Sequence, residues 1–174
     1  MGNLRDRLRH IQSIKKLEKP KEARRDISGL LEKGWEVCAF NVLKRYVKVK
    51  APKMPKKLPP AAVIVIPDLG KCEMPSLGDF LFFDLETTGL SGGAGTIAFL
   101  AAFGRFEKAG TLGITQYLLL DYPGENDFLE NVLKEFESPK SVIVSYNGKS
   151  FDSQIIKTRC LMNRMTPPAY HHAD

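Results

Sequence analysis

The second half of the chain alternates between apolar segments of strand length and segments with helical spacing. Apolar and β-branched residues predict strands over residues 81–90, 95–106, 113–121 and 141–148. Apolar residues at helical spacing from Phe128 to Phe136 predict a helix that begins near Asn126 or Asp127. A second helix is predicted over residues 151–165. The order of elements is therefore β-β-β-α-β-α.

This order predicts an α/β fold built on a mixed sheet. Three consecutive strands with short connections form an antiparallel meander. The crossover helix then returns the fourth strand parallel to the first. Residues 171–174 (HHAD) lie where a further strand is expected to begin.

The first sixty residues have a different pattern. Apolar residues at helical spacing between residues 4 and 17 predict a basic amphipathic helix that ends near Pro20. Apolar residues from Ile27 to Trp35 predict a short helix that Gly34 ends, and residues 46–50 alternate as in a short strand. Residues 51–60 hold four prolines and three lysines, which predicts a linker, and residues 61–67 (AAVIVIP) predict an edge strand. We therefore divide the chain into a basic N-terminal arm with its linker (1–60) and an α/β domain (61–174).

Charge separates these two parts. Residues 1–60 contain 17 Lys and Arg against 6 Asp and Glu, a net charge of +11, whereas residues 61–174 contain 9 against 14, a net charge of −5. The arm is either a solvated helix face or a contact for the nucleic-acid backbone. An acidic domain that handles polyanions requires metal ions to neutralise its carboxylates.

The cysteines and the apolar segments indicate the cellular compartment in which the protein is expected. Three cysteines without C-x-x-C spacing argue against a disulfide framework or a zinc site and predict a reducing, cytoplasmic location. The longest apolar run, from Thr96 to Gly104, is shorter than the roughly 18–20 residues that cross a bilayer, so no membrane contact is expected.

Three carboxylates are expected at one end of the sheet. Asp84 and Glu86 lie two residues apart on a strand, so both side chains face the same way. Their backbones are roughly 7 Å apart, where two unit charges repel by about 2.4 kcal/mol at an effective dielectric of 20, so a positive charge is expected nearby. Asp152 opens the helix after the neighbouring strand, at the same end of the sheet. An oxygen-only donor set of this kind favours Mg²⁺ or Mn²⁺.

Two sequence motifs make this interpretation more specific. FFDLETTGL and SYNGKSFDSQII together resemble the first two motifs of the DEDD (DnaQ-like 3′–5′) exonucleases of the ribonuclease H-like superfamily. The resemblance is closer to the YprB-type ribonuclease H-like family, through LFFDLETTGLSGGAGTIAFLAAFGRF, QYLLLD, SYNGKSFDSQIIKTRCLMNRM and the terminal HHAD. It extends from about Leu81 to Asp174.

The resemblance implies roles for single positions. Asp84 and Glu86 match the first-motif pair that holds two metal ions, and Asp152 matches the second-motif ligand. Thr87, Thr88, Gly89 and Leu90 match the turn that seats a terminal nucleotide. Asn147 matches an asparagine that either binds substrate or closes the turn into the helix.

The resemblance also implies that more chain is needed. Relatives continue into a complete fifth strand, further helices and a last motif with a fourth carboxylate and a general base. Because this chain stops at Asp174, we expect a C-terminally incomplete domain.

The function expected is a metal-dependent nuclease, an exonuclease, that hydrolyses phosphodiester bonds of DNA or RNA with two metal ions. The alternative is a catalytically silent module that binds nucleic acid. A scaffold that uses an uncovered sheet edge is a third possibility.

Overall fold

The computed structural model describes residues 26–51, 76–89, 95–108, 110–137, 142–146, 148 and 151–173. Its elements, in chain order, are α2 (Ser28–Leu31), β1 (Trp35–Ala39), β2 (Val42–Lys50), η2 (Leu77–Asp79), β3 (Phe80–Thr87), β4 (Ala98–Lys108), β5 (Thr111–Leu119), η3 (Tyr122–Gly124), α4 (Glu125–Glu135), β6 (Val142–Val144), α5 (Asp152–Met162) and β7 (His171–Ala173). The helix predicted between residues 4 and 20, the linker beyond Ala51 and the edge strand at 61–67 lie outside the described residues.

All described strands belong to one mixed sheet with the order β1-β2-β5-β4-β3-β6-β7. Strands β3, β4 and β5 form an antiparallel meander, and β6 pairs parallel with β3 after the crossover through α4. The predicted β-β-β-α-β-α order and the mixed sheet are thus confirmed. The strand expected to begin near the end of the chain is present as β7, parallel to β6.

The sheet also includes a segment that the sequence pattern assigns to the N-terminal arm. Strand β2 pairs antiparallel with β5 along its whole length, from Val42 opposite Leu119 to Lys50 opposite Thr111. Strand β1 pairs with the first part of β2 only, as far as Arg45. On its outer edge, the rest of β2 therefore has no partner strand among the described residues. The predicted boundary between residues 60 and 61 lies outside the described residues and stays a prediction.

The turn between β1 and β2 is held against the chain that leads into α4. The Leu120 N–H donates to the Asn41 carbonyl at 2.8 Å. A Cβ on Gly124 would lie 2.5 Å from the Phe40 carbonyl oxygen, so only glycine allows this close approach. Trp35, predicted as part of the short helix, instead begins β1, because Gly34 has a φ of +81° and turns the chain into the strand.

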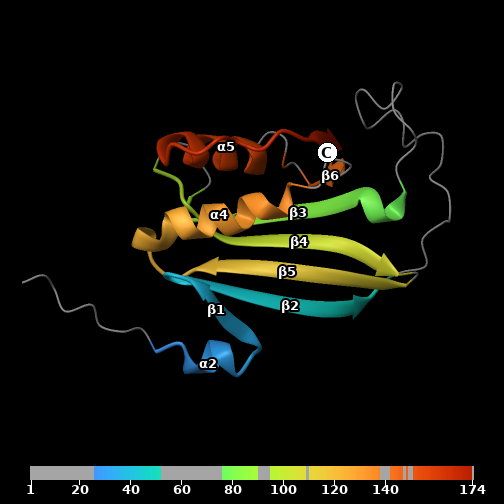
Figure 1. Cartoon of the computed structure of the whole chain (residues 1–174), viewed down its shortest axis with the longest axis horizontal. Coiled ribbons are helices and arrows are strands. Elements are labelled where there is room, and N and C mark those ends of the chain that lie inside the picture. The colour runs from blue at the N-terminus through green and yellow to red at the C-terminus, as the bar shows by residue number, and fades with distance from the viewer. Residues whose placement is uncertain are drawn as a thin grey trace, which may run out of the picture.

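Helices α4 and α5 cover one face of the sheet, which we call the helix face (Figure 1). Strand β3 sends Leu81, Phe83 and Leu85 to this face, where all three side chains are buried. They pack with apolar residues of β4, β5 and both helices in one hydrophobic core. The described part of the chain holds no helix that is long and apolar enough to cross a membrane.

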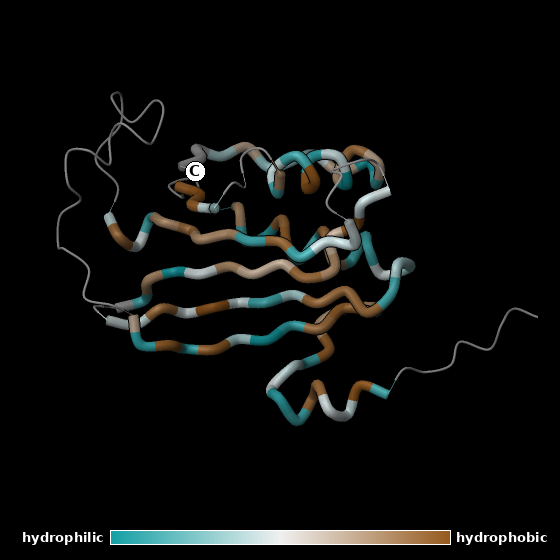
Figure 2. The backbone as a smooth tube through the Cα atoms, turned by 180° about the vertical axis from the view of Figure 1, so that it is seen from behind, coloured by the Kyte–Doolittle hydropathy of each residue, from teal (hydrophilic) through white to brown (hydrophobic). Residues whose placement is uncertain are grey.

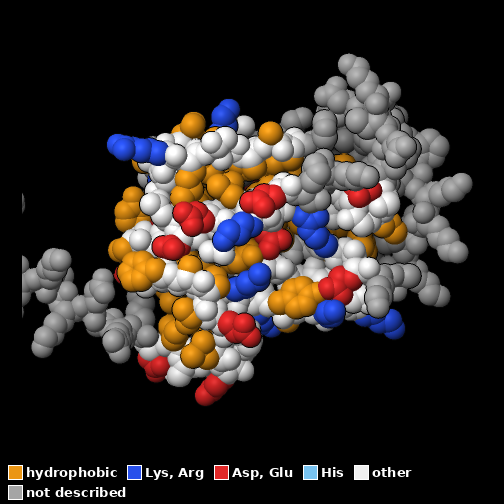
Figure 3. Space-filling view, viewed as in Figure 1, with side chains coloured by type: hydrophobic (Ala, Val, Ile, Leu, Met, Phe, Trp, Pro, Cys, Tyr) orange, Lys and Arg blue, Asp and Glu red, His pale blue; other side chains and the backbone are white. Residues whose placement is uncertain are grey.

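The other face of the sheet, here called the second face, carries the alternate residues of each strand. Figure 2 looks onto this face, and no described helix crosses the central strands there. Phe80 and Val142 are buried in a small separate cluster, with Phe82 and Val144 packed against it. Charged side chains of both signs are interspersed on the opposite side of the molecule (Figure 3).

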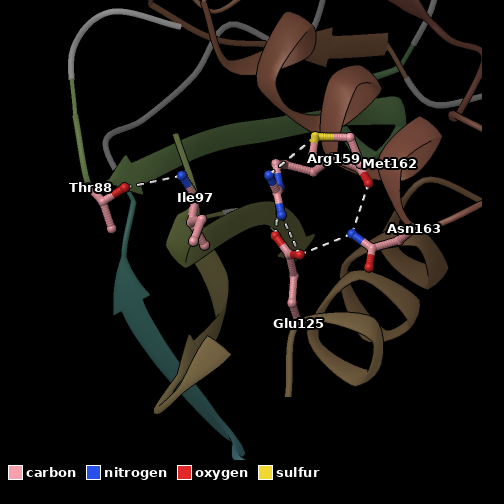
Figure 4. Close-up of polar contacts among 6 residues, drawn as sticks. All are labelled: Thr88, Ile97, Glu125, Arg159, Met162 and Asn163. Atoms are coloured by element: carbon pink, nitrogen blue, oxygen red, sulfur yellow. Dashed lines mark hydrogen bonds and ion pairs between the residues drawn. The ribbon is translucent and has the colours of Figure 1, made fainter. Parts of the chain in front are cut away.

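A buried ion pair joins the two helices (Figure 4). Arg159 of α5 donates from Nε and Nη2 to the two carboxylate oxygens of Glu125 on α4, at 2.6 and 2.5 Å. Asn163 adds a hydrogen bond of 2.9 Å to the same carboxylate. Both charged side chains are about 3% exposed. Hydrogen bonding to Glu125 raises the pKa of Arg159, so this guanidinium stays charged despite its burial.

Replacing Glu125 with alanine should strongly destabilise the fold, because Arg159 would remain as an uncompensated buried charge. We expect Glu125→Ala to lower the free energy of unfolding by about 3–5 kcal/mol. Urea denaturation followed by circular dichroism measures this change. Glu130→Ala, at an exposed position of the same helix, is the matched control and should change stability by no more than about 0.5 kcal/mol. Equal losses in the two variants would contradict a stabilising role for the pair.

Candidate functional site

Strand β3 places Asp84 and Glu86 side by side on the second face. Its burial alternates: Phe83 and Leu85 lie in the core, whereas the two carboxylates between and beyond them are exposed. The apolar residues therefore fix the strand on the helices, and period 2 turns both acids to the opposite side. The predicted shared face is present in the structure.

Neither carboxylate is neutralised within the described structure. Asp84 and Glu86 form no hydrogen bond or ion pair with another described residue. The positive charge expected beside them from the sequence is thus not supplied by a described side chain. Two exposed carboxylates with only oxygen donors have the chemistry of a hard divalent-cation site, and Mg²⁺ or Mn²⁺ fits them.

Asp152 has a different environment. It is the first residue of α5 and only 5% exposed, and it interacts with other groups of the protein. Because β6 runs parallel to β3, the start of α5 follows the same end of the sheet towards which Asp84 and Glu86 lie. The described residues nevertheless contain no group of three His, Cys, Asp or Glu placed to hold a metal ion. The structure therefore brings Asp84 and Glu86 together but leaves Asp152 as a separate, buried carboxylate, and its role as a third ligand stays a prediction.

Tyr170 is a half-buried tyrosine that contacts the first turn of α5, next to Asp152. The Tyr170 hydroxyl donates to Ser153 Oγ at 2.9 Å, next to Asp152 in sequence. Burial raises the pKa of Tyr170, and the negative charge of Asp152 adds to this effect. Tyr170 therefore stays protonated at neutral pH and serves as a hydrogen-bond donor to α5.

The turn after β3 is held in place by its threonines. The Thr87 hydroxyl donates to the Gly89 carbonyl at 2.9 Å. The Thr88 N–H donates to the Ile97 carbonyl at 2.9 Å, and the Thr88 hydroxyl accepts from the Ile97 N–H at 3.1 Å (Figure 4). These bonds attach the turn to the start of β4. The predicted nucleotide-seating roles of Thr87, Thr88 and Gly89 stay predictions, and Leu90 and Asn147 lie outside the described residues.

Gly148 is a site residue that the sequence reasoning did not single out. A Cβ at this position would collide with Ser145 and lie 3.1 Å from Oδ2 of Asp152. The Gly148 carbonyl also accepts a 2.8 Å hydrogen bond from the Ser153 N–H, in the first turn of α5. Glycine is therefore needed chiefly because Ser145 lies so close, and the carboxylate of Asp152 packs tightly against the same position. The Asn-Gly pair in SYNG was the available signal, since it marks a tight turn.

Comparisons with known proteins follow the same part of the chain. Residues 81–174 match the RNase_H superfamily. Over 100 residues, the chain is 38% identical to the uncharacterized protein YprB of Bacillus subtilis (strain 168); this covers 55% of the chain and 23% of YprB. The chain thus spans about a quarter of the length of this curated relative.

Solved structures of E. coli Exonuclease I are similar to the chain at lower identity. The complex with a dA16 oligonucleotide aligns with a TM-score of 0.42 and 22% identity, over 51% of this chain and 24% of the other. The apo enzyme aligns with the same TM-score and identity, over 51% and 25%.

The family match includes β3 with Asp84 and Glu86, the crossover through α4, and β6 with the start of α5. It covers more than half of the chain. The mixed sheet described above has the architecture that the sequence motifs predict. The chain therefore belongs to the RNase_H superfamily, and its sequence is similar to that of YprB.

Proposed function

We propose that this chain carries the metal-binding part of a nuclease that hydrolyses phosphodiester bonds of DNA or RNA from an end. The observation that supports this most is the exposed pair Asp84 and Glu86, both on the second face and without a partner among the described residues. Two neighbouring carboxylates repel each other, and a divalent cation bound between them would replace this repulsion with attraction. In a member of the RNase_H superfamily, a divalent cation is the natural occupant.

Asp84 and Glu86 would hold Mg²⁺ or Mn²⁺, with Asp152 as a third ligand. The metal, when bound, would supply Lewis-acid stabilisation of the phosphodiester and an activated water. The protein contributes the rigid support, because Phe83 and Leu85 anchor β3 in the core on either side of Asp84. The turn at Thr87, Thr88 and Gly89, together with Leu90 and Asn147, would position the terminal nucleotide beside the carboxylates.

A catalytically silent nucleic-acid-binding module is the second candidate. It is favoured by the burial of Asp152 and by the lack of a three-ligand group among the described residues. Such a module would bind nucleic acid with or without metal, and its affinity would survive replacement of Asp84. The two candidates differ in metal binding and in turnover, which can be measured separately.

Metal binding should appear as stabilisation that depends on the carboxylate pair. We expect Mn²⁺ to raise the melting temperature of the wild-type chain, because a ligand that binds only the folded state stabilises it. Asp84→Asn and Glu86→Gln should abolish this rise, whereas Glu130→Gln on α4 should keep it. Differential scanning fluorimetry over a Mn²⁺ titration gives the measurement. A rise of equal size in all four proteins would mean that Mn²⁺ binds elsewhere.

Nuclease activity should depend on the same pair. With Mn²⁺ and end-labelled single-stranded DNA or RNA, we expect the wild type to shorten the substrate, with the label released as small products. Asp84→Asn should lower the rate by at least about 100-fold, because removal of a direct metal ligand costs more than removal of a group behind one. Glu130→Gln is again the control and should retain the wild-type rate. Equal degradation by wild type and Asp84→Asn would overturn the nuclease proposal, and binding without degradation would favour the silent module.

A further inference from the structure

A continuous row of side chains crosses the second face and starts at Asp84. Asp84 lies opposite Ala102 of β4, and Ala102 lies opposite Gln116 of β5. Gln116 in turn lies opposite Arg45 of β2. Residues directly opposite each other in antiparallel strands project to the same face. Arg45 therefore shares the second face with the acidic pair, although 39 positions separate it from Asp84 in sequence.

Arg45 lacks a partner in the described structure. Its Nε is buried and has no hydrogen-bond acceptor. The guanidinium forms no hydrogen bond or ion pair with another described residue. Protein atoms cover Nε, but Arg45 as a whole is only half-buried, so the rest of its unpaired guanidinium is available to a ligand that brings acceptor oxygens. The planar fork of arginine matches the oxygens of a phosphate group.

The surface between Asp84 and Arg45 is suited to an extended chain. Ala102 is small, and Gln116 is neutral and half-buried, so neither blocks the row nor repels an anion. Apolar, half-buried Ile114 and Leu118 flank Gln116 on the same face, where the bases of a nucleic acid could pack. No described helix crosses these strands in the view of Figure 2.

The distance and the charges set a direction along this row. Three strand spacings separate β3 from β2, which corresponds to roughly 14 Å between their backbones. At a rise of about 3.4 Å for each stacked nucleotide, this spans up to about four nucleotides. At the register-paired positions of the second face, Asp84 and Glu86 are the acids and Arg45 is the cation. A substrate end at the carboxylates and a phosphate at Arg45 would thus satisfy both sites at once.

We propose that Arg45 is a phosphodiester-binding residue that holds single-stranded nucleic acid a few nucleotides away from the reacting end at Asp84 and Glu86. This inference rests on the proposed function for the position of the reacting end. It adds a substrate class, since a flexible single strand can follow the row across the sheet whereas a blunt duplex cannot. It also gives the β1–β2 hairpin a role in substrate binding.

Fluorescence anisotropy with a labelled single-stranded DNA dodecamer tests the proposal. We compare Arg45→Gln with Lys48→Gln, which removes the same charge from the same strand but on the helix face, where Lys48 pairs with Glu107 at 2.9 Å. Arg45→Gln should weaken binding about tenfold, the effect of losing one charge-assisted phosphate contact. It should also reduce the slope of log K against log salt by about 0.7, as expected for one phosphate fewer. Lys48→Gln should change affinity much less.

A small substrate separates this inference from the proposed function. The p-nitrophenyl ester of thymidine monophosphate can occupy the carboxylates but cannot reach Arg45. Arg45→Gln should leave its hydrolysis unchanged while lowering kcat/KM for the dodecamer. Arg45→Lys keeps the charge and guards against misfolding, and it should restore part of the affinity. An RNA dodecamer in a parallel titration tells whether the sugar matters.

Three outcomes would overturn the proposal. Equal losses of affinity in Arg45→Gln and Lys48→Gln would mean that only net charge acts. Wild-type affinity in a folded Arg45→Gln variant would remove the phosphate contact while leaving the nuclease proposal intact. No binding of either dodecamer by the wild type at low salt would remove both proposals.

Discussion

The strict alternation of side chains along β3 is the constraint on which the rest of the structure depends. Leu81, Phe83 and Leu85 are buried against the two helices, so the strand cannot rotate or slip by one residue without exposing the core. The same constraint forces Asp84 and Glu86 out of the core on the other side. Stability of the fold and presentation of the acidic pair are therefore consequences of one packing arrangement.

Helix α5 is held in place by contacts at both of its ends. Arg159 near its C-terminal end is bound to Glu125 of α4, and Asp152 at its first residue is held next to Gly148 after β6. The position of Asp152 relative to β3 thus depends on contacts at both ends of the helix. Asp152 can therefore act as a third metal ligand beside Asp84 and Glu86 only where these contacts leave its carboxylate within reach of the pair.

Much of this fold could be predicted from the sequence because its signals are local. The alternating residues of β3, the helical spacing in α4 and the crossover order all follow from short stretches of chain. The acidic pair could be predicted for the same reason, since a period of two decides its face. The place of the β1–β2 hairpin could not be predicted. It depends on the pairing of β2 with β5, for example Val42 with Leu119, and the local pattern of neither strand indicates which strand it pairs with.

The remaining site features depend on register and close packing. That Arg45 shares a row with Asp84 follows only from the pairing of four strands, and the burial of Asp152 appears only once the chain around it is placed. The spacing of residues indicates neither of these two features, although the Asn-Gly pair does mark the turn at Gly148. The sequence shows which side chains are charged. Whether a charged side chain has an ion-pair partner can be seen only in the folded structure.

The half-paired strand β2 has a consequence for how the molecule behaves among its own copies. Beyond Arg45 no described strand pairs with its outer edge, so among the described residues this stretch presents backbone donors and acceptors that another strand could use. Lys48 and Lys50 lie along this stretch, both exposed. Charged side chains, lysine in particular, are among the features that discourage an exposed strand edge from pairing with another chain. Along the described part of this edge, Lys50 and the Lys48–Glu107 pair provide such charged side chains.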